Sequence, residues 1–123
     1  MKTSKRKLGD LGEELACRFL TGLGQKVLER NWRAGHLEVD IITASDDGLH
    51  FVEVKSRTAP VSADPLSSVT LHKMKRMSAA ALSYIHGRQL GGTELFFDLI
   101  TIVFKGGSAD IKHYPQAFLP NIY

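Results

Sequence analysis

The stretch LEVDIITASDDGLHFVEVKSR, residues 37–57, decides the fold because it holds two strand patterns joined by a short polar turn. Residues 37–43 and 49–57 are rich in β-branched and aromatic side chains, which favour strands. Asp47-Gly48 between them is a strong hairpin-turn signal. The stretch therefore predicts a β-hairpin whose two strands also carry several charged side chains.

The length of the hairpin loop determines whether the charged residues of the two strands share a face, because side chains alternate along a strand. A two-residue loop, Asp47-Gly48, places Asp40 opposite Lys55 and diagonal to Glu53. A four-residue loop, 45–48, places Asp40 directly opposite Glu53. A three-residue loop without a bulge would put the two strands' charges on different faces. Loops of even length therefore predict a cluster of Asp40, Glu53 and Lys55.

The rest of the chain predicts an α/β fold, with a mixed central β-sheet flanked by helices in one domain, 1–123. Leucines and Phe19 recur three and four residues apart near the start, as in an amphipathic helix. Thr3 or Ser4 could cap that helix, and Ser67 or Ser68 the second one. We expect helices at 4–23 and from 67 or 68 to about 86–88, strands at 26–32, 94–104 and 111–115, and a turn at 105–110.

Composition narrows the functional class. The chain has 43% hydrophobic residues, and no apolar run approaches the roughly 18 residues of a membrane helix. Acidic residues follow the basic start where an export signal would be apolar, and Cys17 is the single cysteine. These features predict a cytoplasmic protein with no membrane segment and no disulfide-linked partner. The net charge of +3, gathered in three basic clusters, favours a polyanionic partner.

Two carboxylates and a lysine on one face suggest a metal-dependent hydrolytic site. A hard divalent cation offsets the repulsion between such carboxylates, and oxygen ligands favour Mg²⁺ or Mn²⁺ over zinc. The five histidines show no paired metal spacing. Lys55 could orient or deprotonate an attacking water. The alternative is a solvated hairpin face on which Glu38 and Asp40 form weak surface salt bridges with Lys55.

Four other residues allow two interpretations each. Glu13 lies at the border of the first helix's apolar face, and either reaches a cleft or is an ordinary boundary residue. Lys73 lies inside the apolar arc of the second helix, so it either extends to solvent or meets an anion, a phosphate or a carboxylate. Asp98 lies in an apolar strand, where burial with hydrogen bonds is favoured over a site role. Trp32 belongs to the core or to a ligand-facing edge.

Five segments carry a family resemblance: LGDLGEELACRFL, LERNWR, LEVDIITASDDGLHFVEVKSR, SSVTLHKMKRMSAAALSYI and FFDLITI. In order and spacing they resemble the YraN-like family of small bacterial proteins over nearly the whole chain. That family is described as uncharacterised, with a fold like the Holliday-junction resolvases and other PD-(D/E)xK nucleases. The resemblance therefore implies a restriction-endonuclease-like core. Two positions depart from the family pattern: Leu37 and Phe96 stand where glycine and arginine are usual.

The resemblance also implies roles for particular residues. Asp40 and Glu53 would bind the metal, Glu13 would add a third acid from the helix, and Lys55 would be the catalytic lysine. The residues expected to contact nucleic acid are Lys73, Arg76, Arg57 and Arg33.

The predicted function is a Mg²⁺- or Mn²⁺-dependent endonuclease that hydrolyses phosphodiester bonds in DNA, with branched or structured DNA as one candidate substrate. DNA is the expected partner, and a homodimer stays open. The alternative is a non-catalytic nucleic-acid-binding module on the same fold, which predicts salt-sensitive binding without turnover. A third reading is a protein-interaction domain with neither metal nor nucleic acid.

Overall fold

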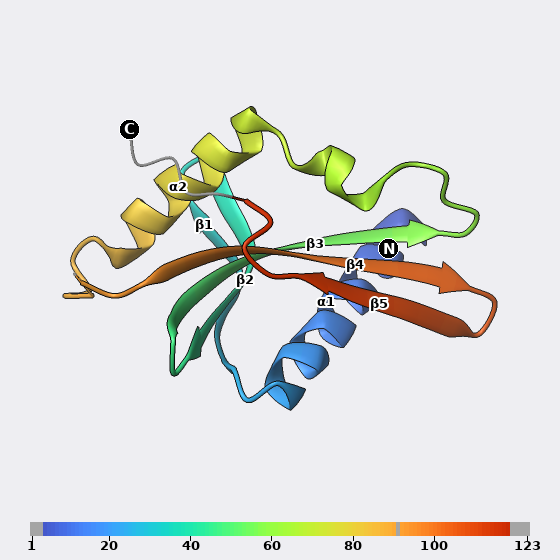
Figure 1. Cartoon of the computed structure of the whole chain (residues 1–123), viewed down its shortest axis with the longest axis horizontal. Coiled ribbons are helices and arrows are strands. Elements are labelled where there is room, and N and C mark those ends of the chain that lie inside the picture. Colours follow the sequence, from blue (N-terminus) through green and yellow to red (C-terminus); the bar gives the residue numbers. More distant parts are fainter. Residues whose placement is uncertain (1–3, 91, 119–123) are drawn as a thin grey trace.

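The computed structural model describes residues 4–90 and 92–118. Five strands form one mixed sheet, with α1 and α2 on its opposite faces (Figure 1), as the sequence predicted. The elements are α1 (Ser4–Gly22), β1 (Lys26–Ala34), β2 (Leu37–Ser45), β3 (Gly48–Thr58), the 3₁₀ helix η1 (Pro65–Ser68), α2 (Leu71–Ile85), β4 (Leu95–Lys105) and β5 (Ser108–Tyr114).

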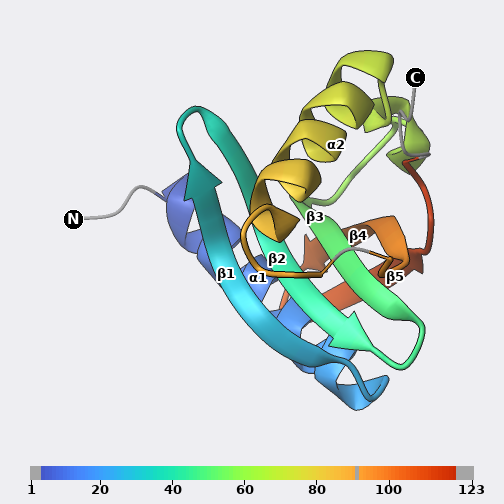
Figure 2. The ribbon, with the colours of Figure 1, turned by 90° about the vertical axis from the view of Figure 1, so that its left-hand side faces the viewer.

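The strands lie side by side in chain order, β1-β2-β3-β4-β5. Three neighbouring pairs are antiparallel and joined by short turns, whereas β3 and β4 are parallel. Parallel neighbours need a crossover, and α2 supplies it. Figure 2 shows α2 in front of the strands and α1 behind them. In this crossover α2 packs mainly over β2 and β1. The start of α2 reaches β3 through the hydrogen bond from Lys73 to Glu53.

Each helix covers its own hydrophobic core. Ile42 and Phe51 lie in the α2-side core together with Met77 of α2. Their chain neighbours Ile41 and Val52 lie in the α1-side core. All four strand residues are fully buried, since alternate side chains of a central strand point to opposite covered faces.

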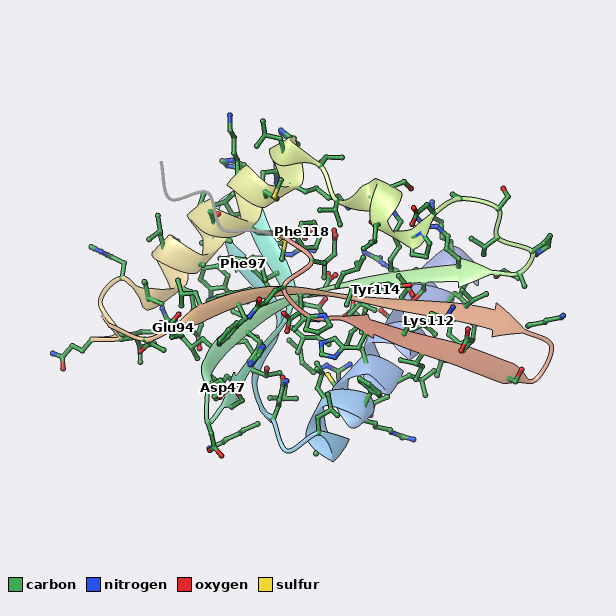
Figure 3. All side chains as sticks on the ribbon, viewed as in Figure 1. Asp47, Glu94, Phe97, Lys112, Tyr114 and Phe118 are labelled. Carbon is green, nitrogen blue, oxygen red and sulfur yellow. The ribbon has the colours of Figure 1, made fainter. Side chains whose placement is uncertain are left out.

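The β2–β3 hairpin has a two-residue turn, Asp46 and Asp47, and Ser45 pairs with Gly48. Figure 3 shows Asp47 at the tip of this hairpin. The register runs from Ser45 to the pair of Ile41 with Val52 and equals that of the four-residue alternative. The turn thus lies one residue earlier than the Asp47-Gly48 signal suggested, without a change of parity.

Gly48 explains why the turn ends where it does. Its φ is +149°. A Cβ at this position would collide with the backbone oxygen of Glu94, the residue directly before β4 (Figure 3). We expect Gly48→Ala to lower the free energy of unfolding by about 1–3 kcal/mol, measured by urea unfolding. Gly107→Ala is the matched control, because a Cβ there meets open space. Equal stability of the two variants would contradict this account.

Two predicted boundaries were wrong. Ser67 and Ser68 belong to η1, and α2 is capped instead by Thr70, whose hydroxyl accepts a hydrogen bond from the backbone N–H of Lys73. Two extended residues, Val69 as the C-cap of η1 and Thr70 as the N-cap of α2, separate the two helices. The predicted turn at 105–110 is only two residues long, because Gly106 adopts φ +60° and lets Lys105 pair with Ser108. Thr3, the other proposed cap of α1, lies outside the described residues.

Phe118 was not foreseen as a core residue. It is 1% exposed and lies in the α2-side core, where its backbone N–H donates to the carbonyl of Phe97. Figure 3 shows both phenylalanines between α2 and the sheet. The segment after β5 therefore returns across the sheet, which no local pattern indicates.

Among the described residues, no helix is long and apolar enough to cross a membrane. Cys17 is a free cysteine on the buried face of α1, at 8% exposure. Burial raises the pKa of its thiol, which therefore stays protonated at neutral pH.

Candidate active site

Strand β2 is irregular at Asp40. Val39 packs into the α2-side core and Ile41 into the α1-side core, although residues two apart on a strand normally share a face. Strand β1 is irregular at the same level, where Asn31 has φ +51°. Strict alternation therefore fails at Asp40, and its side chain is free to turn toward β3.

The edge of β3 opens beside Asp40. Pairing of β3 with β2 ends at Val52, whereas pairing of β3 with β4 continues to Thr58. The backbone N–H of Val54 donates to Asp40 Oδ2 at 2.8 Å. The carboxylate thus takes the place of the missing strand partner, and this bond fixes Asp40 next to the open edge.

Asp40 and Glu53 meet in a small cavity of about 60 Å³, which Glu38 and Met77 also line. Burial raises the pKa of Asp40 to about 7; the hydrogen bond from Val54 opposes this, and the charges of Glu13, Glu53 and Glu38 add to it. Three acidic neighbours and little water make this a site that favours a cation.

Glu53 has two differently placed oxygens. Lys73 of α2 donates from Nζ to Glu53 Oε1 at 2.7 Å. Glu53 Oε2 is buried and has no hydrogen-bond partner among the described residues. Lys73 therefore meets a carboxylate, one of the two anions considered from the sequence, and the second oxygen of Glu53 is left for another ligand.

A larger cleft of about 300 Å³ adjoins this cavity along the open edge of β3. Its lining residues come from the first half of α1, the edge of β3 and the start of α2: Lys5, Leu8, Gly9, Glu13, Glu53, Val54, Lys55, Ser56, Arg57 and Lys73. Burial lowers the pKa of Lys55, the charges of Arg57 and Lys73 lower it further, and Glu53 opposes them. The cleft therefore combines a lysine with a lowered pKa, two acids and several cations.

Glu13 reaches this cleft because α1 lies very close to β3. A Cβ on Gly12 would overlap the Ser56 hydroxyl, so a larger residue at this position would force Ser56 to move. Burial raises the pKa of Glu13, while a hydrogen bond from Asn31 and the charge of Arg30 lower it. Asn31 was given no role in the site from the sequence, although asparagine within a strand signals a residue that tolerates positive φ.

The predicted basic residues divide into two groups. Arg57 lines the cleft and donates to the carbonyl of Ser56. Arg33 and Arg76 do not line it. Arg33 lies 3.5 Å from Glu38 in an exposed ion pair, and Arg76 donates to the carbonyl of His36 at 2.8 Å. These two arginines therefore contact the β1–β2 hairpin instead of the cleft. The turn of this hairpin has its glycine at Gly35, with φ +59°, and so needs none at position 37, where the chain has Leu37.

The donor set suits a hard metal ion held by two protein carboxylates. Within 4–90 and 92–118, no three acidic, histidine or cysteine side chains are grouped as a metal site. Glu13 thus shares the cleft without joining Asp40 and Glu53 as a third ligand in this arrangement. Mg²⁺ needs only one or two carboxylates besides waters and phosphates, and the unpartnered Glu53 Oε2 provides one such oxygen.

A second polar cluster lies away from the cleft around Asp98, which is fully buried. Its Oδ2 lies 2.8 Å from His50 Nδ1, and its Oδ1 accepts the backbone N–H of Gln116. An ionised carboxylate only accepts hydrogen bonds, so His50 Nδ1 donates to Asp98. His50 Nε2 lies 2.8 Å from the hydroxyl of Ser45. This confirms the buried, hydrogen-bonded interpretation of Asp98.

Trp32 belongs to the core rather than to a ligand-facing edge. It packs against the α2-side cluster and contacts the ring of Tyr84 edge-on, with ring centroids 5.3 Å apart.

The fold and the cleft define a small α/β protein whose mixed sheet opens at the edge of β3 into a charged site between two helices. A model of the uncharacterised protein family UPF0102 matches residues 12–102, and the chain belongs to this family, as the YraN-like resemblance predicted. A UPF0102 protein of Myxococcus xanthus is 40% identical over 93% of this chain and 90% of its own length. Another, from Bacteroides thetaiotaomicron, is 38% identical over 95% of this chain and 96% of its own length.

Proposed function

We propose that this protein is a metal-dependent nuclease that hydrolyses phosphodiester bonds in DNA. The observation that carries the proposal is the meeting of Glu53 and Lys55 with Glu13 and Lys73 in one cleft, with Asp40 behind Glu53. The acidic side chains of the cleft favour a metal ion, and the basic side chains beside them favour a phosphate. A cytoplasmic location and DNA as the partner are parts of this proposal, and a homodimer is compatible with it.

The chemistry needs a nucleophile, a proton acceptor and charge stabilisation. Hydrolysis adds water to phosphorus, breaks one phosphorus–oxygen ester bond and moves a proton from the water to the leaving oxygen. Lys55 loses its proton more readily than an ordinary lysine because it is partly buried beside other cations. It is therefore suited to accept the water proton or, when charged, to stabilise the phosphoryl oxygens.

Asp40 and Glu53 are the residues that would hold a divalent ion. A bound Mg²⁺ or Mn²⁺ would lower the pKa of a water and offset charge on the phosphate. Lys5 and Arg57, on the rim of the cleft, would hold neighbouring phosphates.

The test is cleavage of labelled duplex, single-stranded, flap and four-way-junction DNA with Mg²⁺, Mn²⁺ or EDTA. We expect metal-dependent cleavage by the wild type and a loss of about 10²–10³-fold in Lys55→Met, which keeps the aliphatic stem. Lys75→Met is the matched control, because Lys75 is an exposed lysine on α2 that does not line the cleft. Equal cleavage by all three proteins would show that Lys55 takes no part in the reaction.

One observation favours the non-catalytic alternative: Lys73 already neutralises one oxygen of Glu53. A binding module of this kind would retain salt-sensitive DNA binding with no cleavage in any metal. Tight binding that persists in Asp40→Asn, together with an inactive wild type, would establish it.

A further inference from the structure

A second cavity lies against the cleft on the far side of Lys55 and Arg57. Its volume is about 130 Å³, and Lys55 and Arg57 line both spaces. The remaining walls come from the 61–68 segment and from β4: Val61, Ala63, Asp64, Pro65, Ser67, Ser68, Thr101 and Val103. The two spaces thus share a wall made of the two long basic side chains.

The size and lining of this cavity suit one flat ring. A cavity of roughly 150 Å³ lined by apolar side chains holds a benzene molecule, so 130 Å³ matches a six-membered ring rather than a fused purine. Val61, Ala63, Pro65 and Val103 supply apolar surface. The hydroxyls of Ser67 and Ser68 donate to backbone carbonyls of their own turn, which leaves their oxygens able to accept.

The shared wall indicates which kind of ring belongs there. Lys55 and Arg57 line both spaces, so their positive charges lie next to the cleft where we place a phosphate. A guanidinium plane also stacks on a nucleobase. A base inside the cavity would therefore be joined to a phosphate that these same cations attract.

We infer that this cavity, defined here as the base pocket, holds one unstacked pyrimidine base of the DNA strand whose phosphate lies in the cleft. This inference rests on the proposed function and adds a substrate class to it. A base inside a duplex is paired and stacked, so the pocket selects single strands, frayed ends or unpaired positions in branched DNA.

The test compares strands that have the same phosphates but differ in bases. Fluorescence anisotropy in EDTA measures the binding of labelled oligothymidylate, oligodeoxyadenylate and an abasic strand of equal length. We expect the wild type to bind oligothymidylate about tenfold more tightly than the abasic strand, as stacking of a base on protein allows. Oligodeoxyadenylate should gain less, because the fused ring is too large for the pocket.

Two variants fill the pocket from different sides, Ala63→Leu from the loop and Val103→Phe from β4. Each is expected to bind oligothymidylate only as tightly as the abasic strand, with unchanged affinity for the abasic strand. Ala109→Leu, on the exposed part of β5, is the matched control and should keep the tenfold preference. Circular dichroism checks that each variant is folded.

The outcomes separate this inference from the nuclease proposal. Equal binding of the base-bearing and abasic strands by the wild type, or a preference that survives both filling variants, overturns the base pocket even if cleavage is observed. A preference that the filling variants abolish supports the pocket even if no metal yields cleavage. Failure to bind either strand at low salt overturns the pocket as well.

Discussion

Asp40→Asn is expected to reduce metal-dependent cleavage by about 10³-fold, the order lost with a group that stabilises charge in a transition state, and at the same time to make the protein more stable. The amide side chain keeps an oxygen that can accept the Val54 N–H. It removes the negative charge that Glu13, Glu53 and Glu38 oppose. Activity and stability should therefore change in opposite directions.

The gain in stability depends on pH. The pKa of Asp40 rises from 3.8 in the unfolded chain to about 7 in the fold, so ionisation opposes folding. This cost is absent below pH 3.8, grows as the pH rises toward 7 and is complete above it. At pH 8 we expect the variant to be more stable by a few kcal/mol, since each pKa unit corresponds to about 1.4 kcal/mol. At pH 5 the gain should be clearly smaller.

Urea unfolding at pH 5, 6.5 and 8 measures this difference, and the cleavage assay measures the loss of activity. Asp110→Asn is the matched control, because Asp110 is an exposed carboxylate on β5 and should change neither quantity. Added Mn²⁺ should raise the melting temperature of the wild type and leave that of Asp40→Asn unchanged. A variant that is less stable than the wild type at pH 8 would show that Asp40 is held there for structural reasons.

Asp98→Ala is expected to have the largest effect on stability, a loss of about 3–5 kcal/mol in the free energy of unfolding, as when one partner of a buried pair is removed. The N–H of His50 Nδ1 and the backbone N–H of Gln116 would lose their acceptor. Asp98 also joins β4 to the segment after β5, so the position of Phe118 should loosen as well.

Acid should reduce this difference. Burial alone would raise the pKa of Asp98, but the neighbouring His113, the Gln116 N–H and His50 outweigh it and hold the pKa below 3.8. The ionised Asp98 therefore stabilises the fold fully above pH 3.8, and this contribution is lost as the pH falls through the lower folded value. Urea unfolding of the wild type, Asp98→Ala and Asp110→Ala at pH 7 and pH 3 measures it. A constant gap between the first two proteins at both values would contradict a role for the charge.

Much of the fold could be predicted because its signals are local. The leucine spacing of α1 and the paired strand patterns around Asp47 each depend on residues close in sequence. The expectation that the hairpin loop has an even number of residues was also correct, and both even lengths considered bring Asp40 near Glu53 and Lys55. The position of Glu13 at the border of a helix face left two interpretations open, and the structure places this residue in the cleft.

The remaining features depend on contacts between distant segments. Alternation predicts one face for Val39 and Ile41, but the irregularity that Asn31 introduces in the neighbouring strand separates them. No pattern at Phe118 shows that it will cover Phe97. Arg33 and Arg76 were expected to contact nucleic acid. In the fold, Arg33 forms an ion pair with Glu38, and Arg76 donates to the carbonyl of His36.

The part of β3 that extends beyond β2 has a consequence for solubility. An unpaired strand edge is a template for another chain, and proteins commonly block it with charge or with a covering element. Here Glu53, Lys55 and Arg57 alternate along the open edge, and α1 lies close against it at Ser56. The side chains proposed for chemistry thus also guard the protein against edge-to-edge aggregation. Variants that neutralise all three should precipitate at lower protein concentration, even where each single variant stays folded.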